Sequence, residues 1–445
     1  MQAERGRSGA VDGAAPLELW GGVECSVVHA GGRWRDQVRE TGHHDRPGDL
    51  DLIAALGLRT LRYPVLWERC APGPACCGWD WHDARLAGLR DLGITPVVGL
   101  VHHGSGPPSA DVLHPDWALG LAAHAAQAAA RYPWVEAWTP VNEPLTTARF
   151  AALYGYWRPH ATSAASMDAM VVNQCRAVLL SMRAIRARIP GARLVQTEDL
   201  GRVFATPPLA QEAAEANERR WLSLDLLHGR VDRHHPAWPR LAAQGHAPAL
   251  EELRGGEARP DLLGINHYVT SDRYLDHRIH LYPEKQPNGG GRDPFVDMEA
   301  ARIDLPPAMT GWEARLREAW RRYGTPLAIT EAQLTCDDAA EPVRWLLEAW
   351  QAAHALRREG ADIRAVTAWA LFGAVDWDSM MQRSQGRYEA GVWDAGGGTP
   401  RPTLLARAAA SLAATGAFAL PELEGPGWWR RADRLHPAAA EALGC

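Results

Sequence analysis

The chain is poor in lysine and carries no excess of positive charge. Only Lys285 among the 47 basic residues is a lysine, and 53 acidic residues bring the formal net charge to -6 at pH 7. Nucleic acids and anionic membrane surfaces attract proteins through a broad positive field, which this composition does not supply. We therefore expect neither nucleic acid nor a membrane among its partners.

Cysteine is also scarce, and its pattern is not that of a disulfide framework. The seven cysteines are odd in number and scattered through the chain. Residues 1–16 mix charged side chains with glycine and alanine and contain no apolar run of signal-peptide length. We expect these residues to form a disordered leader, the thiols to stay unpaired, and the protein to be cytoplasmic.

Long apolar runs and cofactor motifs are missing. A membrane-spanning helix needs about 18 or more apolar residues in succession, whereas the alanine-rich segment 118–130 is interrupted by His124 and Gln127. The chain has no glycine-rich phosphate or dinucleotide loop, and its adjacent histidine pairs, such as His102 and His103, lack the spacing of a chelating helix face. The sequence predicts no metal and no cofactor.

What the chain has in abundance is tryptophan and short apolar segments. Hydrophobic residues make up 46% of the chain, and 20 residues are tryptophan, whose indole rings fill cores and also suit the apolar faces of sugar rings. Eight apolar runs recur, each followed by a longer stretch of helical periodicity, which is the pattern of parallel βα units. The runs cover residues 17–24, 60–66, 96–101, 135–141, 193–197, 262–266, 326–330 and 364–371.

Eight βα units are the content of a (β/α)8 TIM barrel, an α/β fold. Helical patterns that end at Gly57, Gly93 and Gly324 support this interpretation, because glycine commonly ends helices. We predict one barrel domain over residues 17–420 and a C-terminal tail over residues 421–445. The Pro- and Gly-rich segment 282–295 follows the sixth run and is expected to form a flexible loop over the catalytic face.

Polar side chains stand at the carboxyl ends of these runs, where barrel enzymes place their active sites. The set comprises Glu24, His102, His103, Asn142, Glu143, Glu198, Asn266, Tyr268, Glu331, Asp376 and Trp377. Glu143 and Glu331, at the ends of the fourth and seventh runs, are able to flank one glycosidic bond from opposite sides. Arg62 in the second run is expected to face Glu331 and to lower the pKa of its carboxyl, so that this group stays ionised.

The segments around the two glutamates resemble glycoside hydrolase family one, the retaining β-glucosidase family. Residues 138–144 (WTPVNEP) are similar to its acid/base motif, and residues 327–331 (LAITE) are similar to its nucleophile motif. Further segments that resemble the family in order and spacing are 61–67, 93–102, 263–268 and 369–377. The resemblance covers about residues 17–415.

The resemblance implies a role for each of these residues. Glu143 would act as general acid/base and Glu331 as nucleophile of a retaining double displacement, with the two carboxyl groups about 5 to 5.5 Å apart. Arg62 and Tyr268 would brace Glu331. The side chains implied to line the sugar subsite are His102, Asn142, Asn266, Trp369, Asp376 and Trp377.

Several positions depart from the family pattern. Asp376 stands in place of a glutamate that binds distal sugar hydroxyls, and His103 replaces a tryptophan. Val27 and Val28 stand where a glutamine is expected. Glu24 and Glu198 are carboxylates that the pattern does not include, and Glu198 is expected to bind a polar or cationic substituent. These departures leave the identity of the sugar open.

Alternatives exist for each residue and for the function. The alternative for the two glutamates is a structural role in ion pairs at the barrel rim. The alternative for the histidines, tryptophans and extra carboxylates is a role in packing. The predicted function is hydrolysis of a β-linked glycoside. One alternative is transfer of the sugar to a small-molecule acceptor in deoxysugar or natural-product metabolism, and the other is a non-catalytic sugar-binding module, against which the retained pair of glutamates counts. The oligomeric state is left undetermined.

Overall fold

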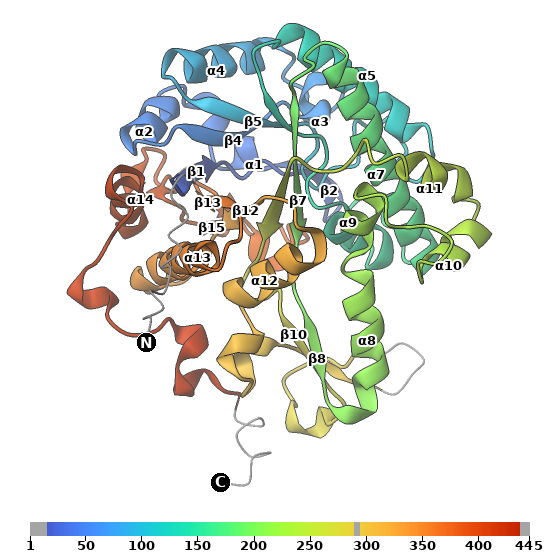
Figure 1. Ribbon diagram of the computed structural model, residues 1–445. Helices are drawn as coiled ribbons and strands as arrows, with labels where there is room; N and C mark the ends of the chain where they lie inside the picture. The colour runs from blue at the N-terminus through green and yellow to red at the C-terminus, as the bar shows by residue number, and fades with distance from the viewer. Residues whose placement is uncertain (1–15, 289–293, 437–445) are drawn as a thin grey trace, which may run out of the picture.

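The computed structural model describes residues 16–288 and 294–436 and contains a closed barrel of eight parallel strands (Figure 1). The strands follow one another around the barrel in chain order, and the last pairs with the first. They are β1 (Glu18–Gly22), β4 (Thr60–Pro64), β5 (Thr95–Gly99), β6 (Ala137–Thr139), β7 (Arg193–Asp199), β9 (Leu262–Asn266), β12 (Leu327–Ala332) and β13 (Ile363–Ala368). Each overlaps one predicted apolar run, so the predicted (β/α)8 fold is confirmed.

Helices surround the barrel (Figure 1). In chain order they are α1 (Gln37–Glu40), α2 (Asp49–Ala55), α3 (Trp67–Cys70), α4 (Asp80–Asp91), α5 (Trp117–Arg131), α6 (Pro144–Ala148), α7 (Ala164–Arg186), α8 (Ala210–Arg219), α9 (Leu222–Leu227), α10 (Trp238–Ala243), α11 (Ala247–Leu253), α12 (Trp312–Tyr323), α13 (Ala340–Arg358) and α14 (Leu404–Thr415). Gly324 and Gly416 end α12 and α14 in the left-handed conformation, with φ of 62° and 73°. Glycine adopts this conformation without a steric cost, which explains these helix ends.

The inside of the barrel is filled by its own apolar cluster. One side chain from each of six strands contributes to it. These residues are Trp20, Val97, Ala137, Val195, Ala328 and Ala365. They lie in the early and middle parts of their strands, and inward-facing layers of this kind close the barrel as a packed core. The polar strand ends therefore form a mouth on one side only.

A small lobe extends the carboxyl ends of β7 and β9. It contains the sheet of β8 (Val203–Ala205), β10 (Arg273–Asp276) and β11 (Val296–Glu299), and it projects below the barrel in Figure 1. Tyr282 is buried against β11, and the backbones of Asn288 and Phe295 pair. The expected flexible loop over residues 282–295 is therefore, in its described part, a hairpin with its own core, while residues 289–293 lie outside the described residues.

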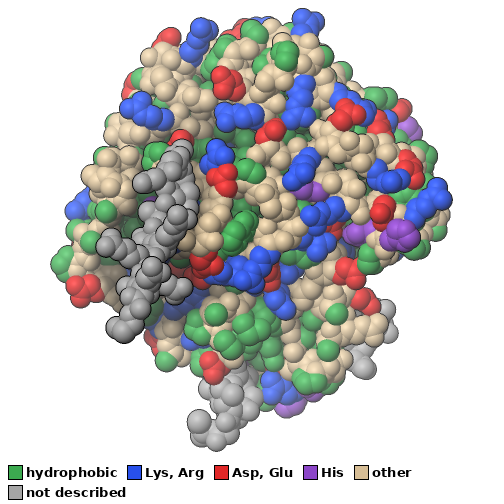
Figure 2. Space-filling view, viewed as in Figure 1, with side chains coloured by type: hydrophobic (Ala, Val, Ile, Leu, Met, Phe, Trp, Pro, Cys, Tyr) green, Lys and Arg blue, Asp and Glu red, His purple; other side chains and the backbone are tan. Residues whose placement is uncertain are grey.

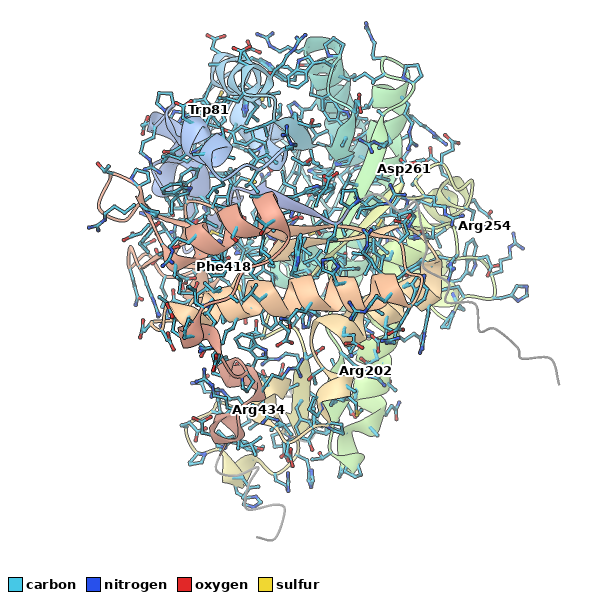
Figure 3. All side chains as sticks on the ribbon, turned by 60° about the vertical axis from the view of Figure 1, so that its left-hand side comes forward. Trp81, Arg202, Arg254, Asp261, Phe418 and Arg434 are labelled. Atoms are coloured by element: carbon cyan, nitrogen blue, oxygen red, sulfur yellow. The ribbon has the colours of Figure 1, made fainter. Side chains whose placement is uncertain are left out.

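The described part of the C-terminal tail docks on the barrel. Its turns are η8 (Pro421–Leu423), η9 (Trp428–Arg430) and η10 (Ala432–Arg434), and they follow α13 toward the lobe, where Arg434 is labelled in Figure 3. Trp429 packs edge-on against Trp345 of α13 at 4.9 Å between ring centroids and donates from Nε1 to Glu348 at 2.7 Å. The predicted leader, except for residue 16, and residues 437–445 of the predicted tail lie outside the described residues.

The outer surface mixes both charges. Figure 2 shows arginine side chains beside acidic side chains over much of one face, and ion pairs such as Arg183 with Glu252 and Glu257 connect the outer helices. Among the described residues, no helix combines the length and the hydropathy needed to cross a membrane.

The remaining short strands lie in the loops between barrel elements. They are β2 (Val27–Ala30), β3 (Arg33–Asp36), β14 (Ala374–Val375), β15 (Tyr388–Glu389), β16 (Trp393–Asp394) and β17 (Arg401–Pro402). The β2–β3 hairpin follows β1, and Ala30 in it forms a backbone bridge with Trp157. This bridge joins the loops that follow the first and fourth barrel strands, so that the two loops border the same mouth.

Candidate active site

Glu143 stands between β6 and α6, at the point where the chain turns into the helix. Its φ is 47°, a left-handed value that is uncommon for a residue with a Cβ atom. Its carboxylate is only 3% exposed, and Oε1 accepts a hydrogen bond of 2.5 Å from Asn266 Nδ2. Strained backbone of this kind persists where the surrounding structure enforces it, often at functional sites.

Glu331 lies on β12 and is held by two donors. Arg62 Nη1 donates to Oε1 at 2.8 Å, and Tyr268 donates from its hydroxyl to Oε2 at 2.6 Å. The pairing of β12 with both neighbouring strands shifts register after Ile329. An irregularity of this kind re-aims a side chain, and here it presents Glu331, 1% exposed, to both donors.

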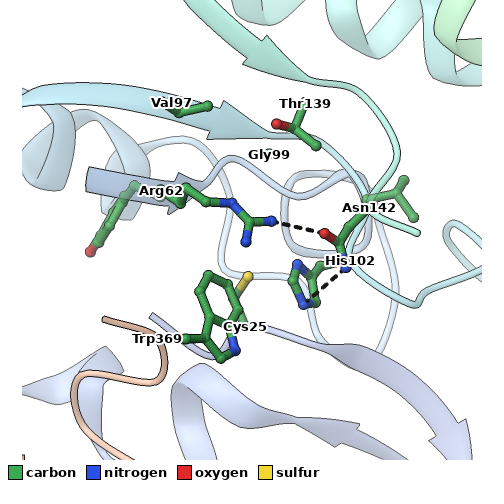
Figure 4. Close-up of a pocket in the computed structure, with 10 residues that line it drawn as sticks. Cys25, Arg62, Val97, Gly99, His102, Thr139, Asn142 and Trp369 are labelled. Atoms are coloured by element: carbon green, nitrogen blue, oxygen red, sulfur yellow. Dashed lines mark hydrogen bonds between the residues drawn. The ribbon is translucent and has the colours of Figure 1, made fainter. Parts of the chain in front are cut away.

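Arg62 links the two halves of the mouth. Besides Glu331, its guanidinium donates to Thr330 O at 2.7 Å and to Asn142 Oδ1 at 2.8 Å. It also lies over the ring of Trp369, 4.5 Å from the centroid. Figure 4 shows Arg62 reaching toward Asn142 with Trp369 beside it. A planar guanidinium with several fixed donors is suited to such a junction.

The pKa values of the two glutamates are raised to different extents because their surroundings differ. Burial raises the pKa of Glu331 to about 7, although Arg62 and Tyr268 oppose the rise. Burial raises the pKa of Glu143 well above its usual range, and the charge of Glu331 raises it further. Arg62 lowers the pKa of Glu331 as expected from the sequence, but the loss of water on burial outweighs this effect and the net pKa is raised. The pKa of Glu143 is nevertheless the higher of the two, which is the order expected for an acid/base glutamate and a nucleophile.

His102 and Trp369 form the floor of the mouth. Their rings stack at 5.3 Å with an interplanar angle of 12°, and the amide of Asn142 lies 3.5 Å from His102 Nε2. Burial lowers the pKa of His102 well below its usual value, so its ring is neutral at pH 7. These side chains, together with Arg62 and Cys25, line the small cavity drawn in Figure 4.

A glycine on β1 makes room for Trp369. A Cβ atom on Gly22 would lie 2.4 Å from Cε3 and Cζ3 of that ring. We expect Gly22→Ala to displace Trp369 and to lower kcat/KM at least tenfold, because small displacements in a site are costly. The control is Gly48→Ala, where a Cβ atom meets nothing within 4 Å. Equal kcat/KM for the wild type and Gly22→Ala, with both folded by circular dichroism, would contradict the expectation.

His103 and Trp377 lie beside Glu143 with a third ring. His103 Nε2 is 3.9 Å from Glu143 Oε2, and its ring packs 5.1 Å from Trp157 and 5.6 Å from Trp377. Burial lowers the pKa of His103 to about 3, which keeps it neutral. Among the described residues, Trp377 Nε1 has no hydrogen-bond partner although it is buried.

Asp376 has partners within the protein for both of its carboxylate oxygens. Its carboxylate accepts from Arg35 Nη2 at 3.0 Å and from the backbone N–H groups of Gln385, Gly386 and Arg387. Burial opposes ionisation, but the backbone donors and Arg35 together hold the pKa of Asp376 below its usual value. These donors let Asp376 organise the 385–387 loop, and the contact with distal sugar hydroxyls that the resemblance implies stays a prediction.

Glu198 likewise serves the protein interior. Its carboxylate accepts from the backbone N–H groups of Leu145 and Thr146 at 2.9 and 3.2 Å, and from Ser223 Oγ at 2.6 Å. It thus satisfies the free N–H groups of the first turn of α6. The expected contact with a sugar substituent is corrected to capping of the helix that begins beside Glu143.

Glu24 borders the site, and both of its carboxylate oxygens already accept hydrogen bonds from the protein. Its Oε1 accepts from Ser26 N and Ser26 Oγ at 2.9 and 2.6 Å, and its Oε2 accepts from Trp369 Nε1 at 3.2 Å. Burial raises its pKa despite these donors. Glu24 therefore orients the Trp369 ring from the end of β1.

Three neighbours of the site were not predicted. Thr197 donates to Asn142 Oδ1 at 2.7 Å, Trp157 packs against His103, and Arg149 follows α6 directly. Trp157 and Arg149 lie outside the barrel strands, where apolar periodicity carries no signal. Among the described residues, no group of three or more His, Cys, Asp or Glu side chains is arranged to hold a metal ion.

Comparison with known proteins agrees with this geometry. The model of glycosyl hydrolase family 1 matches residues 32–388. Thermostable beta-glucosidase B of Thermobispora bispora is 25% identical over 439 residues, which cover 84% of this chain and 86% of that protein. Beta-glucosidase A of Thermotoga maritima is 22% identical over 381 residues, covering 75% and 78%.

A solved structure gives the same result for the fold. Beta-glucosidase from Thermotoga maritima, in complex with deoxynojirimycin, is similar with a TM-score of 0.72 and 17% identity over 91% of this chain and 100% of that chain. The described barrel and the family match over most of the sequence agree with each other. The chain belongs to glycosyl hydrolase family 1 and is a β-glucosidase-like glycoside hydrolase.

Proposed function

We propose that the protein cleaves a β-linked glycoside by double displacement with retention at the anomeric carbon. The observation that carries this proposal is the asymmetry of the two buried glutamates. Glu331 receives hydrogen bonds from a guanidinium and a phenol, whereas Glu143 receives one from the amide of Asn266. One carboxyl is thus prepared to stay ionised and the other to hold a proton, which is what retaining cleavage requires.

In the first step Glu331 attacks the anomeric carbon while the bond from that carbon to the leaving oxygen breaks. Glu143 gives its proton to the leaving oxygen, so that no free alkoxide forms. Because the Asn266 amide occupies Oε1 of Glu143, we assign the proton to Oε2, which lies 3.9 Å from His103 Nε2. The product is a covalent glycosyl ester of Glu331.

The second step uses the same glutamate as a base. The charge of Glu331 contributes to the raised pKa of Glu143, and esterification removes that charge. The pKa of Glu143 then falls, so that it accepts a proton from water, whose oxygen attacks the anomeric carbon and releases Glu331. The coupling between the two carboxyls supports this exchange of roles.

The sugar subsite that we propose consists of His102, Asn142, Trp369 and Trp377. Arg62 and Thr197 already donate to Asn142 Oδ1, so the amide nitrogen is the atom that Asn142 offers to a hydroxyl. Trp377 offers its unpaired indole N–H. Asp376 is left out because donors from the protein surround its carboxylate. We therefore propose that donors from Asn142 and Trp377 dominate sugar recognition.

The proposal is tested with a panel of nitrophenyl β-glycosides that includes 6-deoxy and amino sugars. Release of nitrophenol identifies the sugar, and proton NMR during turnover shows which anomer forms first. We expect the β-anomer. First appearance of the α-anomer would exclude retention, and no release from any glycoside would favour a transferase or a sugar-binding protein.

Transfer to an acceptor other than water is the second candidate function. An aromatic cluster of Phe150, Tyr154, Tyr156 and Trp157 follows the helix after Glu143, and such rings favour an organic acceptor over water. Product analysis with added alcohols distinguishes the two functions, since transfer yields a new glycoside while hydrolysis yields free sugar.

The dependence of kcat/KM on pH is expected to be bell-shaped. The rate rises with pH as Glu331 loses its proton, around its pKa of about 7, and falls again at higher pH as Glu143 loses the proton it must donate. Because the Tyr268 hydroxyl lowers the Glu331 pKa, Tyr268→Phe should move the rising limb to higher pH. Tyr274→Phe in the lobe is the control and should leave the profile in place. A flat profile would contradict the paired-carboxylate mechanism.

A further inference from the structure

Arg149 follows the acid/base glutamate Glu143 in the next turn of the chain, and its guanidinium has no acceptor among the described residues. It opens the π-helical turn η2 (Arg149–Leu153), which continues α6 directly. Its Nε is buried without a partner, and within the described residues its guanidinium makes neither a hydrogen bond nor an ion pair. A guanidinium has only donors and loses free energy when water is removed and nothing replaces it. An acceptor supplied by a ligand would remove this cost.

Aromatic rings stand beside Arg149. Its Cζ lies 5.1 Å from the ring centroid of Phe150. Phe150 stacks on Tyr156 at 6.0 Å with an interplanar angle of 15°, and Tyr154 lies 6.0 Å from Phe150 and 5.5 Å from Tyr156. Tyr154 is 46% exposed, unusual for a large apolar side chain in this protein. We call Phe150, Tyr154, Tyr156 and Trp157 the aromatic wall.

The aromatic wall reaches the acid/base glutamate through direct ring contacts. Phe150 lies 5.3 Å from Trp157, and Trp157 lies 5.1 Å from His103. His103 Nε2 is in turn 3.9 Å from Glu143 Oε2. A general acid must stand beside the leaving oxygen. The group attached to that oxygen therefore leaves the site on the side where the aromatic wall begins.

No acidic side chain among the described residues forms an ion pair with Arg149. Asp199, at the end of β7, is near enough for Arg149 to lower its pKa, which burial raises. The two side chains are nevertheless not within ion-pair distance, and Asp199 accepts its hydrogen bond of 2.6 Å from Ser271. The guanidinium donors thus stay available for another acceptor.

We propose that Arg149 and the aromatic wall recognise a leaving group or acceptor that carries a flat ring and a carboxylate. The ring would pack on Phe150 and Tyr156, and the carboxylate would accept from the guanidinium, for which a bidentate geometry is available. This proposal rests on the proposed glycosidase function, because it assigns the non-sugar half of the substrate of that same site.

The kinetic test compares two probes of equal shape. They are the 4-carboxyphenyl and 4-carbamoylphenyl β-glycosides of the sugar found with the nitrophenyl panel. We expect kcat/KM of the wild type to favour the carboxylate probe about tenfold, the size of one charge-assisted hydrogen bond. Arg149→Gln should bring the ratio close to one, and Arg149→Lys, which keeps the charge, should retain part of the preference.

The matched control is Arg90→Gln. Arg90 also lies over an aromatic ring, with Cζ 5.6 Å from the centroid of Trp134, but it stands on the outer helix α4. This variant should keep the ratio of the wild type. A wild type without preference, or Arg149→Gln with an unchanged ratio, would overturn the proposal.

A second measurement separates this proposal from the glycosidase function. Binding of 4-hydroxybenzoate and 4-hydroxybenzamide is followed by saturation-transfer NMR, which needs no cleavage. Arg149-dependent preference for 4-hydroxybenzoate would support the recognition site even if every glycoside of the panel stays intact. Equal binding of the two compounds to the wild type would overturn the recognition site, whether or not glycosides are cleaved.

Discussion

Glu331→Gly is expected to lower kcat on the best nitrophenyl glycoside by about 10⁵-fold, the loss typical of removing a covalent nucleophile. No other described carboxylate is held by both Arg62 and Tyr268, so none can replace it in the attack. The glycine leaves space beside the anomeric carbon. Added azide should therefore restore turnover and form the glycosyl azide of inverted, α configuration.

The control for this variant is Glu424→Gly, at an exposed position of the C-terminal segment. It should retain the activity of the wild type. Azide rescue is measured by nitrophenol release and by NMR of the product. Retained activity of folded Glu331→Gly without azide, or an azide product of β configuration, would exclude Glu331 as nucleophile.

Glu143→Gln is expected to show a loss that depends on the leaving group. For an alkyl glycoside, whose leaving oxygen needs a proton, kcat/KM should fall by about 10³- to 10⁴-fold. For a dinitrophenyl glycoside, which departs without protonation, kcat/KM should fall by no more than about tenfold. The falling limb of the pH profile should disappear as well, because it reports the proton held by Glu143.

Glu198→Gln is the matched control for this second prediction. Glu198 is a buried glutamate whose charge also raises the pKa of Glu143, but its oxygens cap α6. Because Glu143 remains in place in this variant, the losses for the two leaving groups should differ far less than they do in Glu143→Gln. The decisive measurement is the ratio of kcat/KM for the two glycosides in each variant. Equal losses in Glu143→Gln would show that Glu143 does not protonate the leaving oxygen.

Most of the fold could be predicted from local patterns of apolar residues. The apolar runs that became β9 and β12 are short, flanked by polar residues and followed by helical periodicity, and parallel strands buried on both faces have this appearance. The lobe was not foreseen, because β8, β10 and β11 are short and their pairing joins residues far apart in sequence. Contacts of that kind leave no local periodicity.

Some features of the site could likewise be predicted from the sequence, and others could not. The pairing of Arg62 with Glu331 followed from two strand ends that face one barrel mouth, and the structure has this ion pair at 2.8 Å. The direction of the Glu331 pKa did not follow, because it depends on how completely water is excluded. Asp376 was assigned to the sugar from its place in a motif, yet Arg35, 341 residues away in sequence, holds its carboxylate.

The eight strands and most of the polar residues at their ends could be predicted from the amino-acid sequence alone. Strand geometry is local, and a parallel barrel gathers all carboxyl ends at one mouth. Which of those residues face the mouth, and which are hydrogen-bonded inside the protein, depends on the tertiary structure. A carboxylate binds whichever donors lie nearest, and for Glu198 and Asp376 these are backbone N–H groups of neighbouring segments. Their positions are set by packing of the whole chain.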